Sequence, residues 1–281
     1  MKIKKTRFHK LDPLVRRYIN QFGSGIHRSL LKDSIGDIDA VREYVPGDKR
    51  LDSVASLKAG RVMSRVYSPE RSMTIFILLD TSQSQFYGSG NLKIDVGIAA
   101  GVYLACLAGS VSDKVGLLTF NQSIDRFCEP TIDEKEIISV LYSLKETVNS
   151  GTNWELAIKR ALSLKLSNSL IVLISDFCFR IDDDFLGLLG QLSSGVNNSL
   201  IALALVDDNE WKLSDLPFQA NFLDAESDGR GVLISPKKEN ISFREDLIKN
   251  LRRGRCEPLL ININSSNFLM PLVKYFLRNT V

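Results

Sequence analysis

Residues 73–84 read Met-Thr-Ile-Phe-Ile-Leu-Leu-Asp-Thr-Ser-Gln-Ser, an apolar run that stops at an acid and small hydroxyl residues. The run has no helical period and contains β-branched and aromatic residues, which is typical of a strand buried on both faces. Asp80, Ser82 and Ser84 follow at alternate positions, at the end of the strand where open α/β sheets bind ligands. Because a carboxylate and two hydroxyls are hard oxygen donors of the kind that Mg²⁺ prefers, this stretch predicts part of a cation site.

From residue 73 onward, segments with strand and helix patterns alternate, which is typical of a parallel sheet. We expect an α/β fold: a doubly wound, mostly parallel six-stranded sheet of order 3-2-1-4-5-6, with one antiparallel edge strand and flanking helices. A helix over residues 93–108 is apolar nearly all round and should lie buried against the sheet. The expected strands are residues 73–80, 114–120, 124–128, 169–176 and 199–207, with residues 231–234 as an edge strand.

Two residues further along the chain can complete the cation site. Asp176 ends the fourth strand, which should neighbour the first strand at the point where the strand order reverses and a crevice opens. Thr152 precedes a helix and should reach the crevice from the side. Thr152 to Glu155 also matches a capping box, so a purely structural role for Thr152 remains open. The predicted ligands of a Mg²⁺ ion, or of Mn²⁺ or Ca²⁺ in its place, are Asp80, Ser82, Ser84, Thr152 and Asp176.

Charge divides the chain into two parts. Residues 1–71 hold 16 Lys and Arg against 8 Asp and Glu, whereas the remainder holds 20 against 25. We therefore predict a basic N-terminal extension over residues 1–71 and a main domain over residues 72–281. The extension could contact nucleic acid or an anionic membrane surface, or it could dock on its own acidic domain.

Composition limits the function classes. The chain of 281 residues is 44% hydrophobic, which is enough for a full-sized core, and no signal peptide or membrane span is evident, so we expect a cytoplasmic protein. The four cysteines have no CxxC spacing, which argues against zinc. Both histidines lie in the extension, so the main domain has no histidine general base. A phosphate-binding Gly-x-x-x-x-Gly-Lys loop is absent from the sequence.

The pattern Asp80-x-Ser82-x-Ser84, Thr152 and Asp176 resembles the metal-ion-dependent adhesion site of von Willebrand factor A-type domains. The segment Arg-Glu-Tyr-Val-Pro-Gly-Asp over residues 42–48 narrows the resemblance to one family of proteins with such domains. It is similar to an R-x-Y-x-P-G-D arm in an uncharacterised bacterial family associated with MoxR-type AAA+ ATPases. Two positions depart from that family: Ser53 stands where an aromatic residue is usual, and Gln85 where methionine is usual.

The resemblance implies a Mg²⁺-dependent protein-binding adaptor, or a chaperone-like partner of such an ATPase, that grasps an acidic group of its partner through the metal. It implies no enzymatic activity. The rival interpretations are a Mg²⁺-dependent phosphohydrolase that uses Asp80 as nucleophile, and an adaptor that uses the basic extension. Phosphotransferases of that kind carry a second acid two residues on, where this chain has Ser82. They also need a phosphate-stabilising lysine near the crevice, and no lysine stands at the end of a later core strand.

Overall fold

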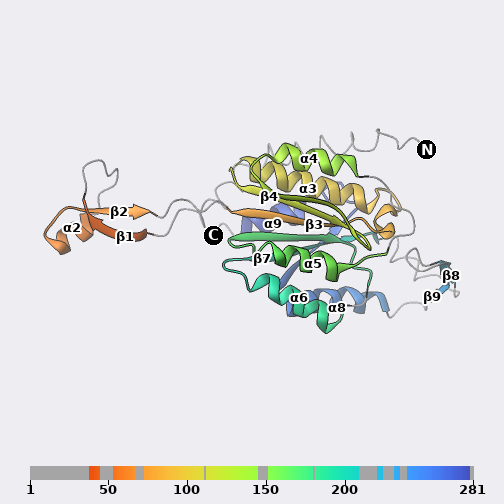
Figure 1. The fold of residues 1–281 in the computed structure, drawn as a ribbon. Helices are drawn as coiled ribbons and strands as arrows, with labels where there is room; N and C mark the ends of the chain where they lie inside the picture. The colour runs from red at the N-terminus through yellow and green to blue at the C-terminus, as the bar shows by residue number, and fades with distance from the viewer. Residues whose placement is uncertain are drawn as a thin grey trace.

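The computed structural model describes residues 38–44, 53–67, 73–110, 112–144, 151–179, 181–208, 220–223, 231–234 and 239–278. Its main sheet consists of β3 (Thr74–Asp80), β4 (Lys114–Phe120), β5 (Ile124–Thr131), β6 (Ser169–Ser175), β7 (Ser199–Val206) and β10 (Cys256–Asn262). The strands lie in the order β10-β7-β6-β3-β4-β5 (Figure 1), and only β4 and β5 pair antiparallel. Numbered along the chain, this is the predicted order 3-2-1-4-5-6, so the predicted fold class is confirmed.

Strand β3 is buried along its whole length, as its apolar sequence predicts. Successive side chains of a strand point to opposite faces, so β3 contributes to two separate cores. Ile75 and Ile77 pack in the core on one face, and Phe76 and Leu78 pack in the core on the other. A strand in this position must be apolar on both faces, and the polar side chain of Asp80, after five apolar residues, marks where the strand ends.

Helices cover both faces of the sheet (Figure 1). One face carries α3 (Lys93–Ser110), α4 (Glu134–Ser143) and α9 (Met270–Arg278), and the other carries α5 (Trp154–Ser163), α6 (Asp183–Ser193) and α8 (Glu239–Arg253). Helix α3 is buried nearly all round, which confirms the predicted central helix. By length and composition alone α3 could cross a membrane, but 83% of its apolar window is buried inside the domain, as in a core helix.

The prediction that residues 231–234 form an edge strand of the main sheet is wrong. Strand β9 (Gly231–Ile234) instead pairs antiparallel with β8 (Ala220–Leu223) in a separate two-stranded sheet. The sixth position of the main sheet is taken by β10, which pairs parallel with β7 after the crossover through α8. A helical crossover brings a strand back parallel to its neighbour. Short strands that are near each other in sequence instead form an antiparallel hairpin.

The described part of the N-terminal extension is a second small unit. Strand β1 (Ile38–Glu43) pairs antiparallel with β2 (Met63–Tyr67). Between them lies the short helix α2 (Ser53–Ala59), which buries none of its residues (Figure 1). The Pro46-Gly47-Asp48 part of the arm lies outside the described residues.

Gly116 in β4 provides a test of how closely the core is packed. It pairs with Phe76, and a Cβ atom at Gly116 would lie 2.7 Å from Cδ2 of the Phe76 ring and 3.1 Å from Cγ of Pro130. We expect Gly116→Ala to lower the free energy of unfolding in urea by about 1–3 kcal/mol, because the buried ring has to shift.

The matched control is Gly187→Ala in α6, where an added Cβ meets no atom within 4 Å. This change should raise the free energy of unfolding by about 0.5–1 kcal/mol, because alanine favours a helix more than glycine does. Equal effects of the two substitutions would contradict the close approach at Gly116.

Candidate metal centre

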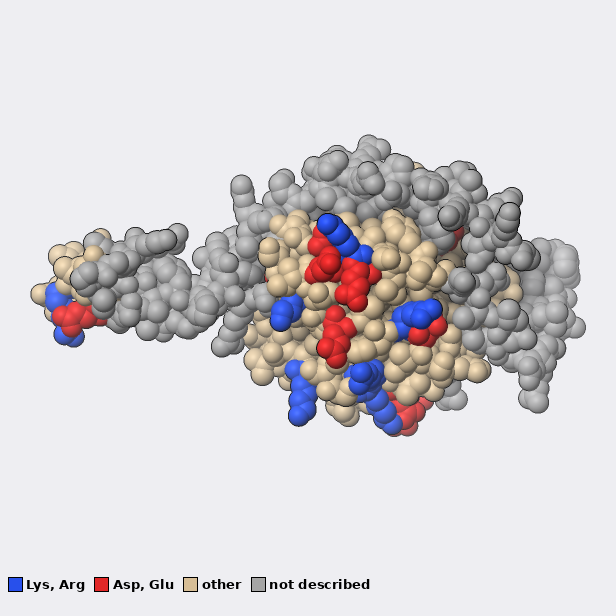
Figure 2. Space-filling model, turned by 45° about the horizontal axis from the view of Figure 1, so that its top comes forward, with Lys and Arg blue, Asp and Glu red and all other residues tan. Residues whose placement is uncertain are grey.

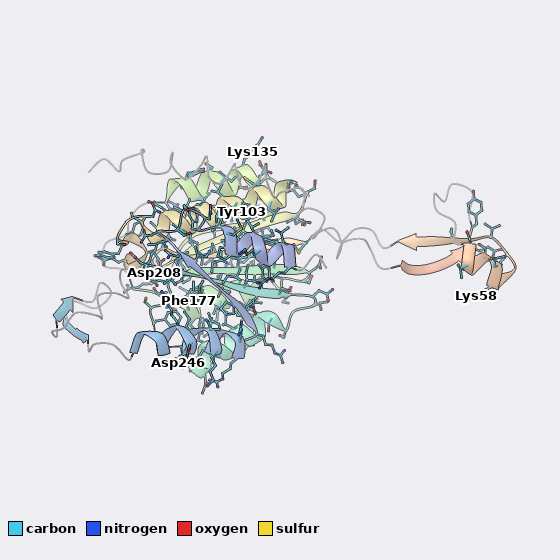
Figure 3. All side chains as sticks on the ribbon, turned by 180° about the vertical axis from the view of Figure 1, so that it is seen from behind. Lys58, Tyr103, Lys135, Phe177, Asp208 and Asp246 are labelled. Atoms are coloured by element: carbon cyan, nitrogen blue, oxygen red, sulfur yellow. The ribbon has the colours of Figure 1, made fainter. Side chains whose placement is uncertain are left out.

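The predicted site lies at the carboxyl ends of β3 and β6, which are neighbours at the point where the strand order reverses. Asp80 is the last residue of β3, and Asp176 follows the last residue of β6. In Figure 3, the labelled residues Phe177, which follows Asp176, and Asp208, which follows β7, mark this edge of the sheet. Both acids therefore lie at the ends of neighbouring strands, at the edge of the sheet where the sequence predicts the crevice.

Asp80 is almost completely buried, with 1% of its surface exposed, and it is held by three donors. Its Oδ1 accepts a hydrogen bond from the Ser82 backbone N–H at 2.8 Å. Its Oδ2 accepts from Ser175 Oγ at 2.7 Å and from Thr152 Oγ1 at 3.4 Å. These bonds fix the orientation of the carboxylate and bring the predicted ligand Thr152 to it from a different part of the chain.

The two serines of the pattern contact each other. Ser82 Oγ and Ser84 Oγ lie 3.2 Å apart, and Nε2 of Gln85 donates to Ser84 Oγ at 3.3 Å. Ser82 stands at the start of the 3-10 turn η1 (Gln83–Phe86) but makes no side-chain cap bond. The buried Gln85, which departs from the family pattern, thus holds a predicted ligand, and its Oε1 is buried without a hydrogen-bond partner.

Thr152 does not form the capping box that its sequence allows. The N-cap of α5 is Asn153, whose side chain accepts from the Leu156 N–H at 3.0 Å, and Glu155 pairs with Lys159 instead of reaching back. The Asn153 backbone N–H donates to the Asn121 carbonyl at 2.9 Å, which ties this loop to the β4–β5 hairpin. The structure therefore places Thr152 toward Asp80 rather than in a helix cap.

Asp176 makes an ion pair that the sequence does not announce. Lys93 Nζ donates to Asp176 Oδ2 at 3.0 Å, and both side chains are almost fully buried. The Cys178 N–H donates to Asp176 Oδ1 at 3.3 Å. Lys93 is the first residue of a mostly apolar helix that also carries Asp95, and the sequence around it gives no sign of the pairing with Asp176.

The residue after Asp176, Phe177, has a strained backbone conformation. Phe177 has φ of 52°, in the left-handed region that a bulky residue adopts at a cost of about 1–2 kcal/mol. Its ring is fully buried and stacks on Trp154 with centroids 5.4 Å apart. The Phe177 N–H donates to Ser175 Oγ at 3.1 Å, so this turn also orients the hydroxyl that holds Asp80.

Burial and, to a lesser extent, the negative charge of Asp176 together raise the pKa of Asp80 to about 7, against the opposing effect of the hydrogen bonds from Ser82 and Ser175. Near neutral pH, a cation that binds the carboxyl group therefore displaces its proton, because metal ligands bind in the deprotonated form.

The donor set fits a divalent cation. Metal–oxygen distances of about 2.1 Å for Mg²⁺ and about 2.4 Å for Ca²⁺ place neighbouring ligands of an octahedron about 3.0 and 3.4 Å apart. The Ser82–Ser84 and Asp80–Thr152 oxygen pairs, at 3.2 and 3.4 Å, lie close to this range. Metal binding by these residues remains a prediction. Among the described residues, no group of three or more His, Cys, Asp or Glu offers an alternative cluster.

A family model described as "Protein of unknown function DUF58" matches residues 40–256. The chain belongs to this family. None of the curated proteins matches it. Among solved structures, the conserved hypothetical protein BatB from Bacteroides thetaiotaomicron matches with a TM-score of 0.52 at 14% identity, over 74% of this chain and 98% of that chain. This likeness shows that the two proteins share a fold.

Two further solved structures are similar over most of their length. An aerotolerance-related membrane protein from Bacteroides fragilis matches with a TM-score of 0.49 at 18% identity, over 74% of this chain and 99% of that chain. The VWA domain of SpRpn10 matches with a TM-score of 0.46 at 13% identity, over 73% of this chain and 95% of that chain.

The raised pKa of Asp80 predicts how the stability of the metal-free protein changes with pH. The pKa of Asp80 is about 7 in the folded state, whereas in the unfolded chain the carboxyl group has its ordinary pKa of 3.8. Since the folded state binds more protons over this interval, its stability falls as pH rises from about 4 to about 7. The loss of stability across the whole interval is about 4 kcal/mol.

Urea unfolding in EDTA at several pH values checks this expectation. Asp80→Asn keeps the shape of the side chain but cannot ionise, so it should remove this part of the pH dependence. The same slope in wild type and Asp80→Asn would show that Asp80 is already ionised across the interval.

Proposed function

We propose that the main domain is a non-enzymatic, Mg²⁺-dependent protein-binding module. The observation that carries the proposal is the meeting of Asp80, Ser82, Ser84 and Thr152 at the edge of the sheet where β3 and β6 end, with Asp176 beside them. Mg²⁺, or Mn²⁺ or Ca²⁺ in its place, would be held by these five residues. The metal's chemistry here is to supply a concentrated positive charge with a coordination position for an outside ligand.

The charges of the site favour an acidic group on the partner. Asp80 and Asp176 together balance a divalent cation, and the ammonium of Lys93 adds a positive charge beside Asp176. An anionic group from outside is therefore attracted both to the metal and to Lys93. This arrangement supports a protein partner that offers an aspartate or glutamate side chain.

We further propose that the protein works as an adaptor, or a chaperone-like partner, of a MoxR-type AAA+ ATPase. This step rests on the resemblance of the Arg42–Asp48 arm and the adhesion-site pattern. A cytoplasmic location is part of the same proposal. On the face shown in Figure 2, acidic and basic side chains of the described residues lie interspersed, without the continuous basic patch that favours nucleic-acid binding.

Metal binding is tested by isothermal titration of the full chain with Mg²⁺ and Mn²⁺. Wild type should bind one ion, and Asp80→Ala should lose binding, because it removes one of only two carboxylates. The matched control is Asp246→Ala, which removes an exposed carboxylate on α8, in the outer layer (Figure 3). Equal affinity of wild type and Asp80→Ala would exclude the metal assignment.

The partner is tested on the same proteins. Co-elution with a MoxR-type AAA+ ATPase in size-exclusion chromatography is expected for wild type in Mg²⁺. It should disappear in EDTA and with Asp80→Ala. Co-elution that withstands both changes would place the ATPase contact elsewhere on the protein.

A Mg²⁺-dependent phosphohydrolase is the second candidate, because Lys93 lies beside Asp176. A lysine beside a metal-bound aspartate is what an aspartyl-phosphate mechanism uses to stabilise the transferred phosphate. Ser82 still stands where such enzymes carry a second acid, which would protonate the leaving group. Lys93 also forms an ion pair with Asp176, and this carboxylate competes with a phosphate for the ammonium.

This candidate predicts phosphatase activity of the purified full chain toward a small phosphomonoester. Such activity should depend on Mg²⁺ and should fall at least a thousandfold in Asp80→Asn, which lacks the nucleophilic oxygen. Activity at the level of the buffer in wild type would leave the binding module as the function of this site.

A further inference from the structure

The ion pair between Lys93 and Asp176 is the part of the site that neither the fold nor the predicted ligand pattern accounts for. Lys93 Nζ lies 3.0 Å from Asp176 Oδ2, and the two side chains are only 4% and 5% exposed. Burial disfavours an ammonium unless a carboxylate compensates its charge. Lys93 is also the first residue of α3, where the partial positive charge of the helix end disfavours a cation. Both the burial of the ammonium and its position at the helix N-terminus thus oppose the charge of Lys93, and the contact with Asp176 offsets them.

We propose that Lys93 is the resident cation of the site and competes with the divalent ion for Asp176. The inference rests on the proposed function and concerns its regulation. Lys93 compensates Asp176 in the metal-free protein, so the domain folds without metal. The same residue lowers the affinity for a divalent ion, because a metal at Asp176 must share the carboxylate with an ammonium or displace it.

The hydrogen bonds of Asp176 show why the two cations interfere. Oδ2 is engaged by Lys93, and Oδ1 accepts from the Cys178 N–H at 3.3 Å. A carboxylate oxygen keeps a second lone pair, so a metal can still reach Asp176. It then lies within a few ångströms of the ammonium, and two cations at that distance in a buried site repel each other strongly.

Repulsion of this kind makes metal binding conditional on an anion. A partner carboxylate that joins the site relieves the repulsion between the metal and Lys93. By thermodynamic linkage, the acidic group then raises the affinity for the metal, and the metal raises the affinity for the acidic group by the same factor. The site is therefore expected to fill mainly when a partner is present, rather than at rest.

Isothermal titration of the full chain with Mg²⁺ and Mn²⁺ tests this role, with Lys93→Met as the variant. Methionine fills a similar volume without charge. We expect Lys93→Met to bind Mg²⁺ at least tenfold more tightly than wild type. The control is Lys114→Met, which makes the same change at an exposed position where β4 begins, at the opposite end of the strands. It should bind as wild type does.

Thermal unfolding supplies an independent readout. In EDTA, Lys93→Met should melt at a lower temperature than wild type, because Asp176 loses its compensating charge. Saturating Mg²⁺ should raise its Tm by more than it raises that of wild type. If Lys93→Met does not fold in EDTA, Lys93→Gln provides the measurement, because it removes the charge and keeps an N–H donor toward Asp176.

The outcomes separate this proposal from the proposed function. Metal binding by wild type with equal or weaker binding by both Lys93 variants would overturn the competing role of Lys93 and leave the metal site standing. A lack of binding in wild type, Lys93→Met and Lys93→Gln alike would overturn the metal site, and this inference with it.

Discussion

Two carboxylates buried side by side at the ends of β3 and β6 are the constraint on which the rest of the site depends. An unpaired buried charge costs several kcal/mol, so each acid requires its own compensation. Asp80 receives three hydrogen-bond donors and holds its proton up to about pH 7, whereas Asp176 receives the ammonium of Lys93. The two acids therefore remain close without a metal, and they offer a cation a prepared pair of ligands.

The aromatic side chains beneath the site keep this arrangement rigid. Trp154 contacts four phenylalanines, among them Phe177 and Phe120, with ring centroids 4.6–6.1 Å apart. Trp154 is also the first residue of α5, immediately after the Thr152 loop. The cluster thus links the loop that presents Thr152 to the turn that presents Asp176. Packing of this quality offsets the strain at Phe177, and it leaves the polar side chains little freedom to rearrange.

The sequence predicts the parts of this protein that local signals control. The strand order follows from the alternation of apolar segments, and Asp80 and Asp176 follow from the acids that end two such segments. The prediction of the sixth strand is wrong because Glu257 and Pro258 interrupt the apolar pattern of β10. The sheet tolerates this proline because β10 is an edge strand. Residues 231–234 have a more continuous apolar pattern than β10, yet they pair with β8, the strand that precedes them in the sequence.

The parts that escape prediction depend on contacts between distant residues. Lys93 is 83 positions from Asp176, and nothing in its neighbourhood shows that a residue at the start of a helix turns inward. Ser175 is a hydroxyl in an apolar strand and reaches Asp80 across 95 positions. The choice of Asn153 over Thr152 as helix cap depends in turn on the bond that ties this loop to the β4–β5 hairpin.

The loop before α3 keeps Lys93 where it is. The backbone N–H and hydroxyl of Ser89 donate to the two carboxylate oxygens of Asp207 at 2.6 and 2.9 Å, and Asn91 Nδ2 donates to the Ile263 carbonyl at 2.8 Å. These bonds fix the loop to the ends of β7 and β10, so a swing of the loop cannot carry Lys93 away from Asp176. Only the torsions of its own side chain remain adjustable. A metal that enters the site therefore keeps an ammonium as its neighbour, and an anion from outside that binds the metal relieves that repulsion.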